Sequence, residues 1–330
     1  MSTAHDSTRL RLVILTVLVL VCLLVGLAAG TVPLSPGQVW HGLWRADTSA
    51  SVIVRDLRAP RVLLAFAVGG SLAVCGAALQ AMIRNPLAEP YLLGLSGGAG
   101  LGAVIAIATE ATGPWSVPLA AFVGAIAAVA LVYRLSVVAG RRLDPRVLLL
   151  SGVVVGSFAG ALMSAIIVLS PAAGIRNAFL WLLGGFGAAS WRSLGVFAAY
   201  AALPLAIIGL NGRNLDLVAL GEEPAHHLGT DVDRTRRVIY ACTALLTAAS
   251  VATCGIIGFV GLVVPHAVRT VARPIHRTLL PLVFVVGGSF LVLSDVLSRT
   301  VVRPLELPVG VITALVGVPL FAVLLRRTMA

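Results

Sequence analysis

Long apolar runs recur along the whole chain, and they decide what it can fold into. Runs of about 18 or more apolar residues are long enough to cross the ~30 Å hydrocarbon core of a bilayer as α-helices. The 330 residues are 59% hydrophobic and only 11% charged, which is too few charges to keep a soluble domain of this length dispersed. A membrane β-barrel would show short alternating segments instead of continuous runs. We therefore expect an all-α, polytopic membrane protein.

The runs predict ten spans in a single transmembrane domain that covers residues 1–330. The first run follows Arg9 and Arg11, as in a signal peptide, but it is long for that role and further spans follow it. The run around "CGIIGFVG" forms either two short spans or one long one. The expected spans are 12–30, 62–81, 90–108, 116–138, 147–169, 193–210, 238–256, 257–271, 280–298 and 309–325.

The chain contains 24 arginines and no lysine. The distribution of the arginines predicts how the spans are oriented in the membrane. Cytoplasmic loops carry an excess of positive charge. With ten spans and a cytoplasmic N-terminus, sixteen arginines lie inside and eight outside. This bias favours two cytoplasmic termini and favours splitting the run at "CGIIGFVG". The arginines expected outside are Arg45, Arg55, Arg58, Arg61, Arg176, Arg192, Arg299 and Arg303.

The absence of lysine has a chemical consequence. A Walker A loop uses its lysine to reach the β- and γ-phosphates of ATP, so this chain carries no such loop. If transport is driven by ATP, the ATPase is a different polypeptide. The net charge of +11 does not indicate nucleic-acid binding, because the arginines are scattered between spans and form no patch with interleaved aromatic residues.

Two further segments combine glycine with apolar residues. The stretch 94–103, "GLSGGAGLGA", lacks the G-x-G-x-x-G spacing of a dinucleotide site. Small residues let another helix approach closely, or they line a pathway for a bulky solute. Segment 171–192, "PAAGIRNAFLWLLGGFGAASWR", is too short and interrupted for a span. It is expected to form an interfacial helix on the outer face or a re-entrant element.

The longest cytoplasmic stretch is 211–237, which has mixed charge. Adjacent histidines point to different faces of a helix, so we expect no metal site from the four polar residues near its centre. Apolar side chains in the same stretch favour docking to a partner. The four polar residues are Glu222, Glu223, His226 and His227, and the apolar ones are Leu217, Leu220 and Leu228.

Several individual residues could have either a functional or a structural role. Asp295 is the one acidic residue well inside an apolar run, so it is either functional or paired with Arg299 one turn away. His266 is more typical of a structural hydrogen bond than of a proton relay. The four cysteines lie in apolar runs without a CxxC motif and are expected to be packing residues.

A short pattern occurs twice with identical spacing. Gly69-Gly70-Ser71 precedes Pro86-Leu87 and Pro90, and Gly287-Gly288-Ser289 precedes Pro304-Leu305 and Pro308. The two copies would have opposite orientations, as in inverted repeats. In so biased a composition, coincidence is the preferred explanation.

Several blocks, in order from about residue 55 to the C-terminus, resemble the iron-siderophore, haem and cobalamin (FecCD/BtuC-type) permeases of ABC importers. They are "LRAPRVLLAFAVGGSLAVCGAALQAMIRNPLAEPYLLGLSGGAG", "WLLGGFGAASW", "LALGEEPAHHLG", "GFVGLVVPHAVR" and "ELPVGVITALVGVPLF". The resemblance implies a type II importer fold with ten helices per subunit. It also implies a second permease subunit in a homo- or heterodimer, two cytoplasmic ABC ATPase subunits and an extracytoplasmic substrate-binding protein. No cofactor is expected on this chain, since ATP and Mg belong to the ATPase.

The resemblance also assigns roles to particular residues. Outer arginines of the family pair with glutamates of the binding protein, and the matching positions are Arg58, Arg61 and Arg299, with Arg55 and Arg303 as further candidates. The cytoplasmic gate matches Asn85 and Leu87 in "RNPLAEP", and Asp144 and Pro145, where Asp-Pro replaces the polar pair of the cobalamin member. The ATPase coupling loop matches Leu220, Gly221, Leu228 and Gly229. Three possibilities are open for Glu89: it contacts the ATPase, it caps the third span, or it does neither.

Together these features predict a transporter subunit without enzymatic activity in the cytoplasmic (inner) membrane. The expected cargo is a ferric siderophore or a similar bulky chelate, a preference that rests on "RPLELPVG". Haem and cobalamin are the alternatives within the family. A proton-coupled secondary transporter is the rival class, and it would need titratable groups at mid-membrane. A membrane enzyme would need clustered His, Asp or Glu, which the sequence does not show.

Overall fold

The computed structural model describes residues 2–45, 49–111, 113–140, 144–272 and 275–329, and all the regular elements in these ranges are helices. Arg141, Arg142 and Arg273, counted among the inside arginines, lie outside the described residues. Each expected span corresponds to one helix. These ten are α1 (Ser2–Ala28), α4 (Ala59–Ile83), α5 (Leu95–Ala108), α6 (Ser116–Gly140), α7 (Pro145–Leu169), α9 (Trp191–Leu210), α12 (Val232–Cys254), α13 (Val260–Val271), α14 (His276–Thr300) and α15 (Val309–Met329).

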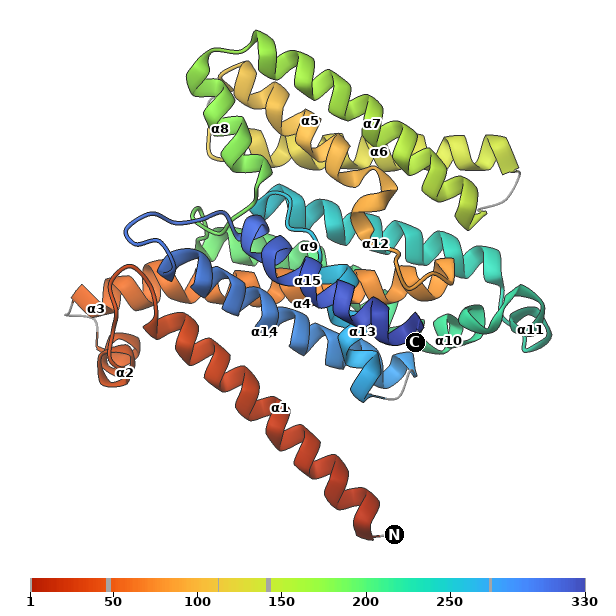
Figure 1. The fold of residues 1–330 in the computed structure, drawn as a ribbon, viewed down its shortest axis with the longest axis horizontal. Helices are drawn as coiled ribbons and strands as arrows, with labels where there is room; N and C mark the ends of the chain where they lie inside the picture. The colour runs from red at the N-terminus through yellow and green to blue at the C-terminus, as the bar shows by residue number, and fades with distance from the viewer. Residues whose placement is uncertain (1, 46–48, 112, 141–143, 273–274, 330) are drawn as a thin grey trace.

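The remaining helices are short and lie at the two ends of the bundle (Figure 1). At one end are α2 (Pro36–Trp44), α3 (Ser49–Ser51), the π-helix η1 (Val52–Arg58) and α8 (Ala172–Leu182). At the opposite end are α10 (Gly212–Leu220) and α11 (Glu222–His227). The 3₁₀ helix η2 (Pro90–Leu93) precedes α5. Helix α8 lies within the segment for which an interfacial helix was expected.

Local sequence signals explain where several helices begin. Asp144 and Asp231 cap α7 and α12, each accepting a backbone N–H of the first turn with its carboxylate. Pro145 occupies the first position of α7, where a helix needs no N–H donor. These caps place the starts of two helices at residues that the hydropathy pattern alone locates only within several positions.

The long run around "CGIIGFVG" forms two helices, which confirms the split. Helix α12 ends at Gly255, whose φ of 73° favours glycine, and α13 starts after Phe259, whose φ is 70°. Helix α13 has 12 residues and α5 has 14, fewer than the ~20 of a full span. Within the described residues, six helical segments are long and apolar enough to cross a membrane by themselves.

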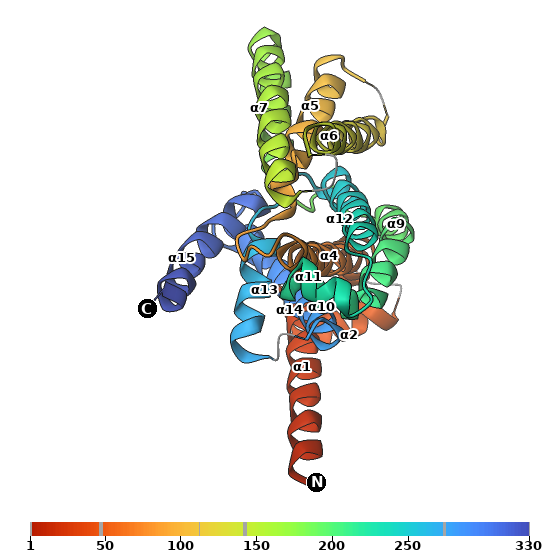
Figure 2. The same ribbon diagram turned by 90° about the vertical axis from the view of Figure 1, so that its right-hand side faces the viewer.

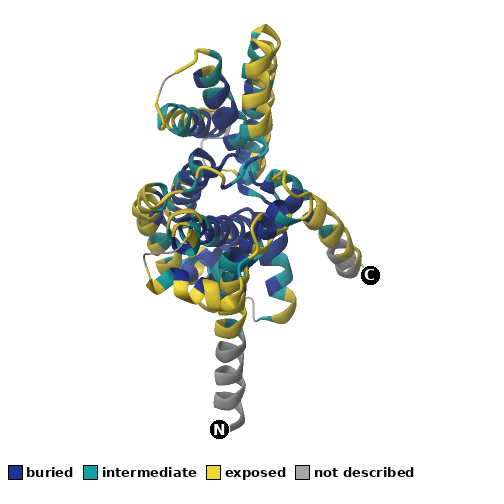
Figure 3. Cartoon of the chain, turned by 90° about the vertical axis from the view of Figure 1, so that its left-hand side faces the viewer, coloured by how far each residue is buried: buried dark blue, intermediate teal, exposed yellow. Residues whose placement is uncertain are grey.

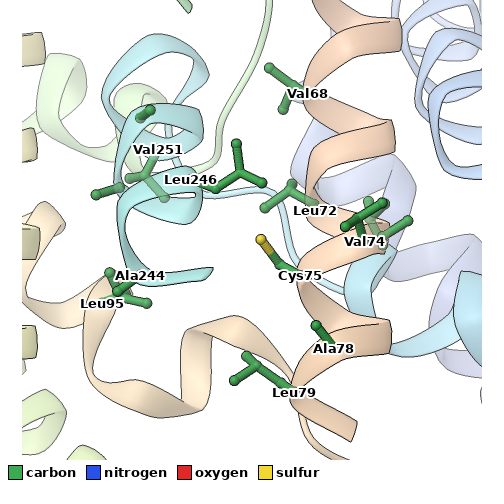
Figure 4. Packing of buried hydrophobic residues seen from close by; sticks show 14 of the residues in the cluster. Val68, Leu72, Val74, Cys75, Ala78, Leu79, Leu95, Ala244, Leu246 and Val251 are labelled. Atoms are coloured by element: carbon green, nitrogen blue, oxygen red, sulfur yellow. The ribbon is translucent and has the colours of Figure 1, made fainter. Parts of the chain in front are cut away.

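Helices α4 and α14 form the centre of the bundle. Leu72 and Cys75 of α4 point toward Leu246 of α12 (Figure 4), and buried residues gather around α4, α12, α13 and α14 (Figure 3). Helices α7 and α15 project from this centre with mostly exposed surfaces (Figures 2 and 3). On α7, the exposed side chains include Phe158 and Leu169.

The two copies of the glycine pattern meet where α4 and α14 cross. A Cβ built on Gly69 would lie 2.4 Å from the carbonyl oxygen of Gly287, and one built on Gly287 would lie 2.6 Å from that of Gly69. Phe66 and Phe284, each three residues before its glycine, pack edge to face with ring centroids 5.9 Å apart. The repeated pattern is thus a reciprocal contact between two antiparallel helices.

Candidate functional site

Arginines dominate the end of the bundle that carries α2 and α8. Arg58 donates through Nη1 to the carbonyl oxygens of Leu27 (2.7 Å) and Ala28 (2.9 Å), the last residues of α1. Arg299 donates to Ala29 (3.1 Å) and Gly26 (3.2 Å) in the same way. Both arginines are buried and satisfy carbonyl groups that a helix end leaves free.

Asp295 lies at the centre of this arginine cluster. Its carboxylate accepts from Arg61 Nη2 at 2.9 Å and forms an ion pair with Arg299 Nε at 3.0 Å, and the side chain is 1% exposed. Arg299 Nε donates to the backbone carbonyl of Asp295 at 3.2 Å. The expected pair with Arg299 is confirmed, and Arg61 is a second partner. Buried carboxylates are tolerated when they are paired in this manner.

Arg61 has one edge at the surface. Its Nη2 also donates to Glu306 Oε2 at 2.9 Å, and the side chains of Arg61 and Glu306 are 12% and 41% exposed. Of the three arginines matched to binding-protein docking, Arg61 is the most accessible in the isolated chain. Arg303 is exposed, and Arg55 donates through Nε to the carbonyl oxygen of Leu43 at 2.9 Å.

Next to this cluster lies a cavity of about 800 Å³. Its walls come from the ends of α5 and α12, from α8, and from the loops 184–188 and 306–309. Charged and polar side chains on the wall are Arg61, Glu110, Asn177, Thr253 and Glu306. Ligand pockets for organic molecules range from about 300 to 1,000 Å³. The cavity is thus large enough to receive a substantial part of a bulky solute.

The "RNPLAEP" turn is held in shape by its own side chains. Arg84 ends α4 in the left-handed conformation, with φ of 55°. Asn85 Oδ1 accepts from the backbone N–H of Leu87 at 2.9 Å, which is an Asx turn. Leu87 is exposed and Asn85 is half-buried. Asn85 therefore has a structural partner inside the turn, and Leu87 is its accessible apolar residue.

Glu89 connects this turn to the break between α12 and α13. Its Oε1 accepts from the backbone N–H of Phe259 at 2.6 Å, so it caps the start of α13 and not the third span. Burial raises the pKa of the Glu89 carboxyl, and the Phe259 N–H opposes the rise. Tyr91 adds a second link, since its hydroxyl accepts from the N–H of Ile257 at 3.2 Å.

The second segment matched to the cytoplasmic gate, Asp144 and Pro145, lies beside the end of α4. Asp144 Oδ1 accepts from the N–H of Arg146 at 2.7 Å, and Asp144 is exposed. Pro145 borders a small crevice together with Met82 of α4 and Arg236 of α12. Both residues have an evident role in starting α7, and their part in gating stays a prediction.

The stretch matched to the coupling loop forms α10 and α11. Gly221 and Gly229 have φ of 127° and 81°, conformations that favour glycine. The backbone therefore accounts for the glycine at both of these positions of the coupling-loop match. Leu220 and Leu228 are 67% and 57% exposed. Two large apolar side chains in water at a polar loop suit contact with a partner.

Two polar contacts that the sequence did not suggest join this loop to the bundle. Asp216 Oδ1 accepts from both the backbone N–H (2.9 Å) and the Nδ1–H (2.6 Å) of His276. Glu222 Oε1 accepts from Arg236 Nη2 at 2.7 Å. Each pair is too far apart in sequence for spacing to reveal it. Among the described residues, no three His, Cys, Asp or Glu side chains are grouped to hold a metal ion.

The remaining singled-out residues are packing elements. His266 lies edge to face against Phe321 of α15, with ring centroids 6.4 Å apart. All four cysteines are free and buried.

Comparison with known proteins agrees with these features. Residues 18–327 match the FecCD transport family. The chain is 44% identical over 283 residues to the cobalamin import system permease protein BtuC of Halobacterium salinarum, covering 84% of this chain and 74% of that protein. It is 39% identical over 318 residues to the vitamin B12 import system permease protein BtuC of Escherichia coli, covering 96% and 94%.

The fold has also been seen experimentally. A metal-chelate type ABC transporter solved in an inward-facing conformation superimposes with a TM-score of 0.86 and 29% sequence identity, over 95% of this chain and 97% of that one.

Proposed function

We propose, from the premise that this chain belongs to the FecCD transport family, that it carries a bulky metal chelate inward across the membrane. It is a permease of the ABC importer class, and the fold and its apolar helices make it an integral inner-membrane protein. The observation that carries the proposal is the 800 Å³ cavity beside the arginine cluster. Its place at the end opposite α10 and α11 suits entry of a solute from outside.

The relatives favour a corrinoid as the first cargo to test. Two of them, 44% and 39% identical to this chain, are named for cobalamin or vitamin B12 import. A ferric siderophore is the second candidate within the same chemical class, with haem as the third. All three are large chelates whose metal is already coordinated, so the permease needs no metal ligands of its own.

Family membership implies a second permease subunit, ATPase subunits and a binding protein. We assign the ATPase to the exposed Leu220 and Leu228 on the cytoplasmic side. The binding protein is assigned to the opposite end, where Arg61 reaches the surface with Arg58 and Arg299 buried behind it. This orientation has both termini in the cytoplasm, as the arginine bias predicts.

The proposed cycle uses the two ends in turn. ATP binding to the partner subunits shifts α10 and α11, and the bundle rocks so that the cavity closes outside and the turn 84–89 opens inside. ATP and Mg act on the partner, which supplies the lysine that this chain lacks. A proton-coupled mechanism has little support here, because Asp295 is paired with two arginines.

Uptake by proteoliposomes tests the proposal. The chain is reconstituted with its cognate ATPase and binding protein, and uptake of radiolabelled cyanocobalamin and of a ferric hydroxamate is measured. We expect ATP-dependent uptake of one chelate and none when the Walker A lysine of the ATPase is replaced. Uptake by this chain alone, driven by a pH gradient, would contradict the proposal and support the secondary-transporter class.

A further inference from the structure

The coupling segment, defined as residues 212–227 of α10 and α11, packs against the start of α14 and is hydrogen-bonded to it through Asp216 and His276. Both donors of His276, the first residue of α14, converge on a single oxygen of Asp216. The His276 side chain is 5% exposed and that of Asp216 is 31% exposed. A contact made by a backbone and a side-chain donor fixes direction as well as distance, so α10 is oriented on the start of α14.

Helix α14 continues from this point to the arginine cluster. Its 25 residues span about 37 Å at ~1.5 Å per residue. Asp295 and Arg299 lie in its last turns and contact Arg61 and the end of α1. One helix thus begins at the segment assigned to the ATPase and ends at the cluster assigned to the binding protein.

Helix α14 is packed tightly where it crosses α4, and between His276 and this crossing Pro281 removes one backbone N–H from the helix. At Gly69 and Gly287 the backbones of α4 and α14 are in direct contact, with no space for a Cβ on either side. Phe66 and Phe284 close the crossing on its flanks. Closely packed helices move as rigid bodies and not by continuous deformation. A displacement at His276 that passes Pro281 would reach Asp295 through the closely packed part of α14.

We propose that the Asp216–His276 pair is the joint that ties the coupling segment to α14, and that α14 is the strut linking the two partner surfaces. Asp216 and His276 act as positioning residues, because they touch neither cargo nor ATP. The inference rests on the proposed function and adds to it the path between its two ends. The Glu222–Arg236 contact joins the same segment to α12, whose end at Cys254 lines the cavity beside the arginine cluster, whereas α14 contributes Asp295 and Arg299 to the cluster itself.

The experiment measures how strongly the binding protein stimulates ATP hydrolysis in the complete reconstituted transporter. The readout is the ratio of ATPase rates with and without binding protein in one preparation, so it does not depend on how much complex assembles. Asp216→Ala removes the acceptor for both His276 donors, and Asp216→Asn retains one neutral oxygen. The matched control is Thr278→Ala, which removes a local bond to Ile275 in the same turn without touching α10.

We expect Asp216→Ala to lower the stimulation ratio at least about fivefold, the lower end of usual coupling between sites. Asp216→Asn should fall between this variant and wild type, and Thr278→Ala should match wild type. If Asp216→Ala does not assemble, a reduced ratio in Asp216→Asn supports the joint and an unchanged ratio overturns it. A wild-type ratio in Asp216→Ala also overturns it. A wild-type transporter that shows neither stimulation nor uptake refutes the proposed function, and the inference with it.

Discussion

Gly69 and Gly287 face each other across the crossing of α4 and α14, and each occupies the space that the other's Cβ would need. The contact is reciprocal, since a Cβ on either glycine would meet the backbone carbonyl of its partner. Small residues permit such close approach of membrane helices, where van der Waals packing is the main attraction. The crossing lies on the proposed path between the two partner surfaces, which makes it a position where stability and coupling depend on the same atoms.

Enlarging this contact should destabilise the protein. Gly69→Ala would place a methyl group 2.4 Å from the Gly287 carbonyl oxygen, so one helix must shift. Overpacking of this kind costs about 1–3 kcal/mol. We expect a lower midpoint of thermal unfolding in detergent. Gly195→Ala is the control, because a Cβ there meets nothing within 4 Å. An equal midpoint for Gly69→Ala and wild type would show that the crossing of α4 and α14 has room for an added methyl group.

The arginine cluster should depend far more on Asp295 than on Glu306. Asp295→Asn leaves the buried Arg299 guanidinium without its paired carboxylate and leaves Arg61 with Glu306 alone, and breaking a buried pair costs about 3–5 kcal/mol. Glu306→Gln removes an exposed partner, which is typically worth about 0–1 kcal/mol. Thermal unfolding of both variants measures the difference. Similar losses in the two variants would contradict the central place of Asp295.

The carboxylate of Glu89 should hold the turn 84–89 in place against the start of α13. Glu89→Ala removes the acceptor of the Phe259 N–H and should raise hydrogen–deuterium exchange in peptides covering 84–91 and 256–262. Glu89→Gln keeps an oxygen at this place and should show a smaller increase. Glu223→Gln is a control on the same side of the bundle. Unchanged exchange in Glu89→Ala would mean that Tyr91 alone holds the two segments together.

The exposed leucines Leu220, in the coupling segment, and Leu228, directly after it, should carry much of the affinity for the ATPase. Burying one leucine side chain is worth about 1.5–3 kcal/mol, so its loss weakens binding about tenfold or more. Leu220→Ser and Leu228→Ser are therefore expected to raise the Kd for the ATPase subunit in a titration with the solubilised chain. The control is Leu305→Ser, a change to an equally exposed leucine at the opposite end. Equal effects of Leu220→Ser and Leu305→Ser would argue against the assigned surface.

Much of the fold could be predicted because apolar length and arginine asymmetry are local properties of the sequence. The split of α12 from α13 is an example: the orientation bias indicated it, and Gly255 and Phe259 in left-handed conformations produce it. The short length of α13 was expected once the run was split. Helix α5 begins later than its expected span, because Gly94, with a φ of 76°, separates it from the 3₁₀ helix η2.

Most of the contacts that build the two sites could not be predicted from the sequence. Arg61 and Asp295 are 234 residues apart, and Asp216 and His276 are 60 apart, so no spacing rule brings them together. The outer arginines were expected outside, and their burial against the end of α1 depends on how α1 packs. The repeated glycine pattern was visible in the sequence, but its meaning as a mutual contact required the relative position of two helices.

The burial of all four cysteines has a practical consequence for following this transporter in motion. The native thiols are shielded, so thiol-directed probes should label the unmodified chain only weakly. A spin label or fluorophore on a cysteine introduced at residue 220, and another at residue 305, would report the separation of the two ends of the molecule throughout the ATP cycle.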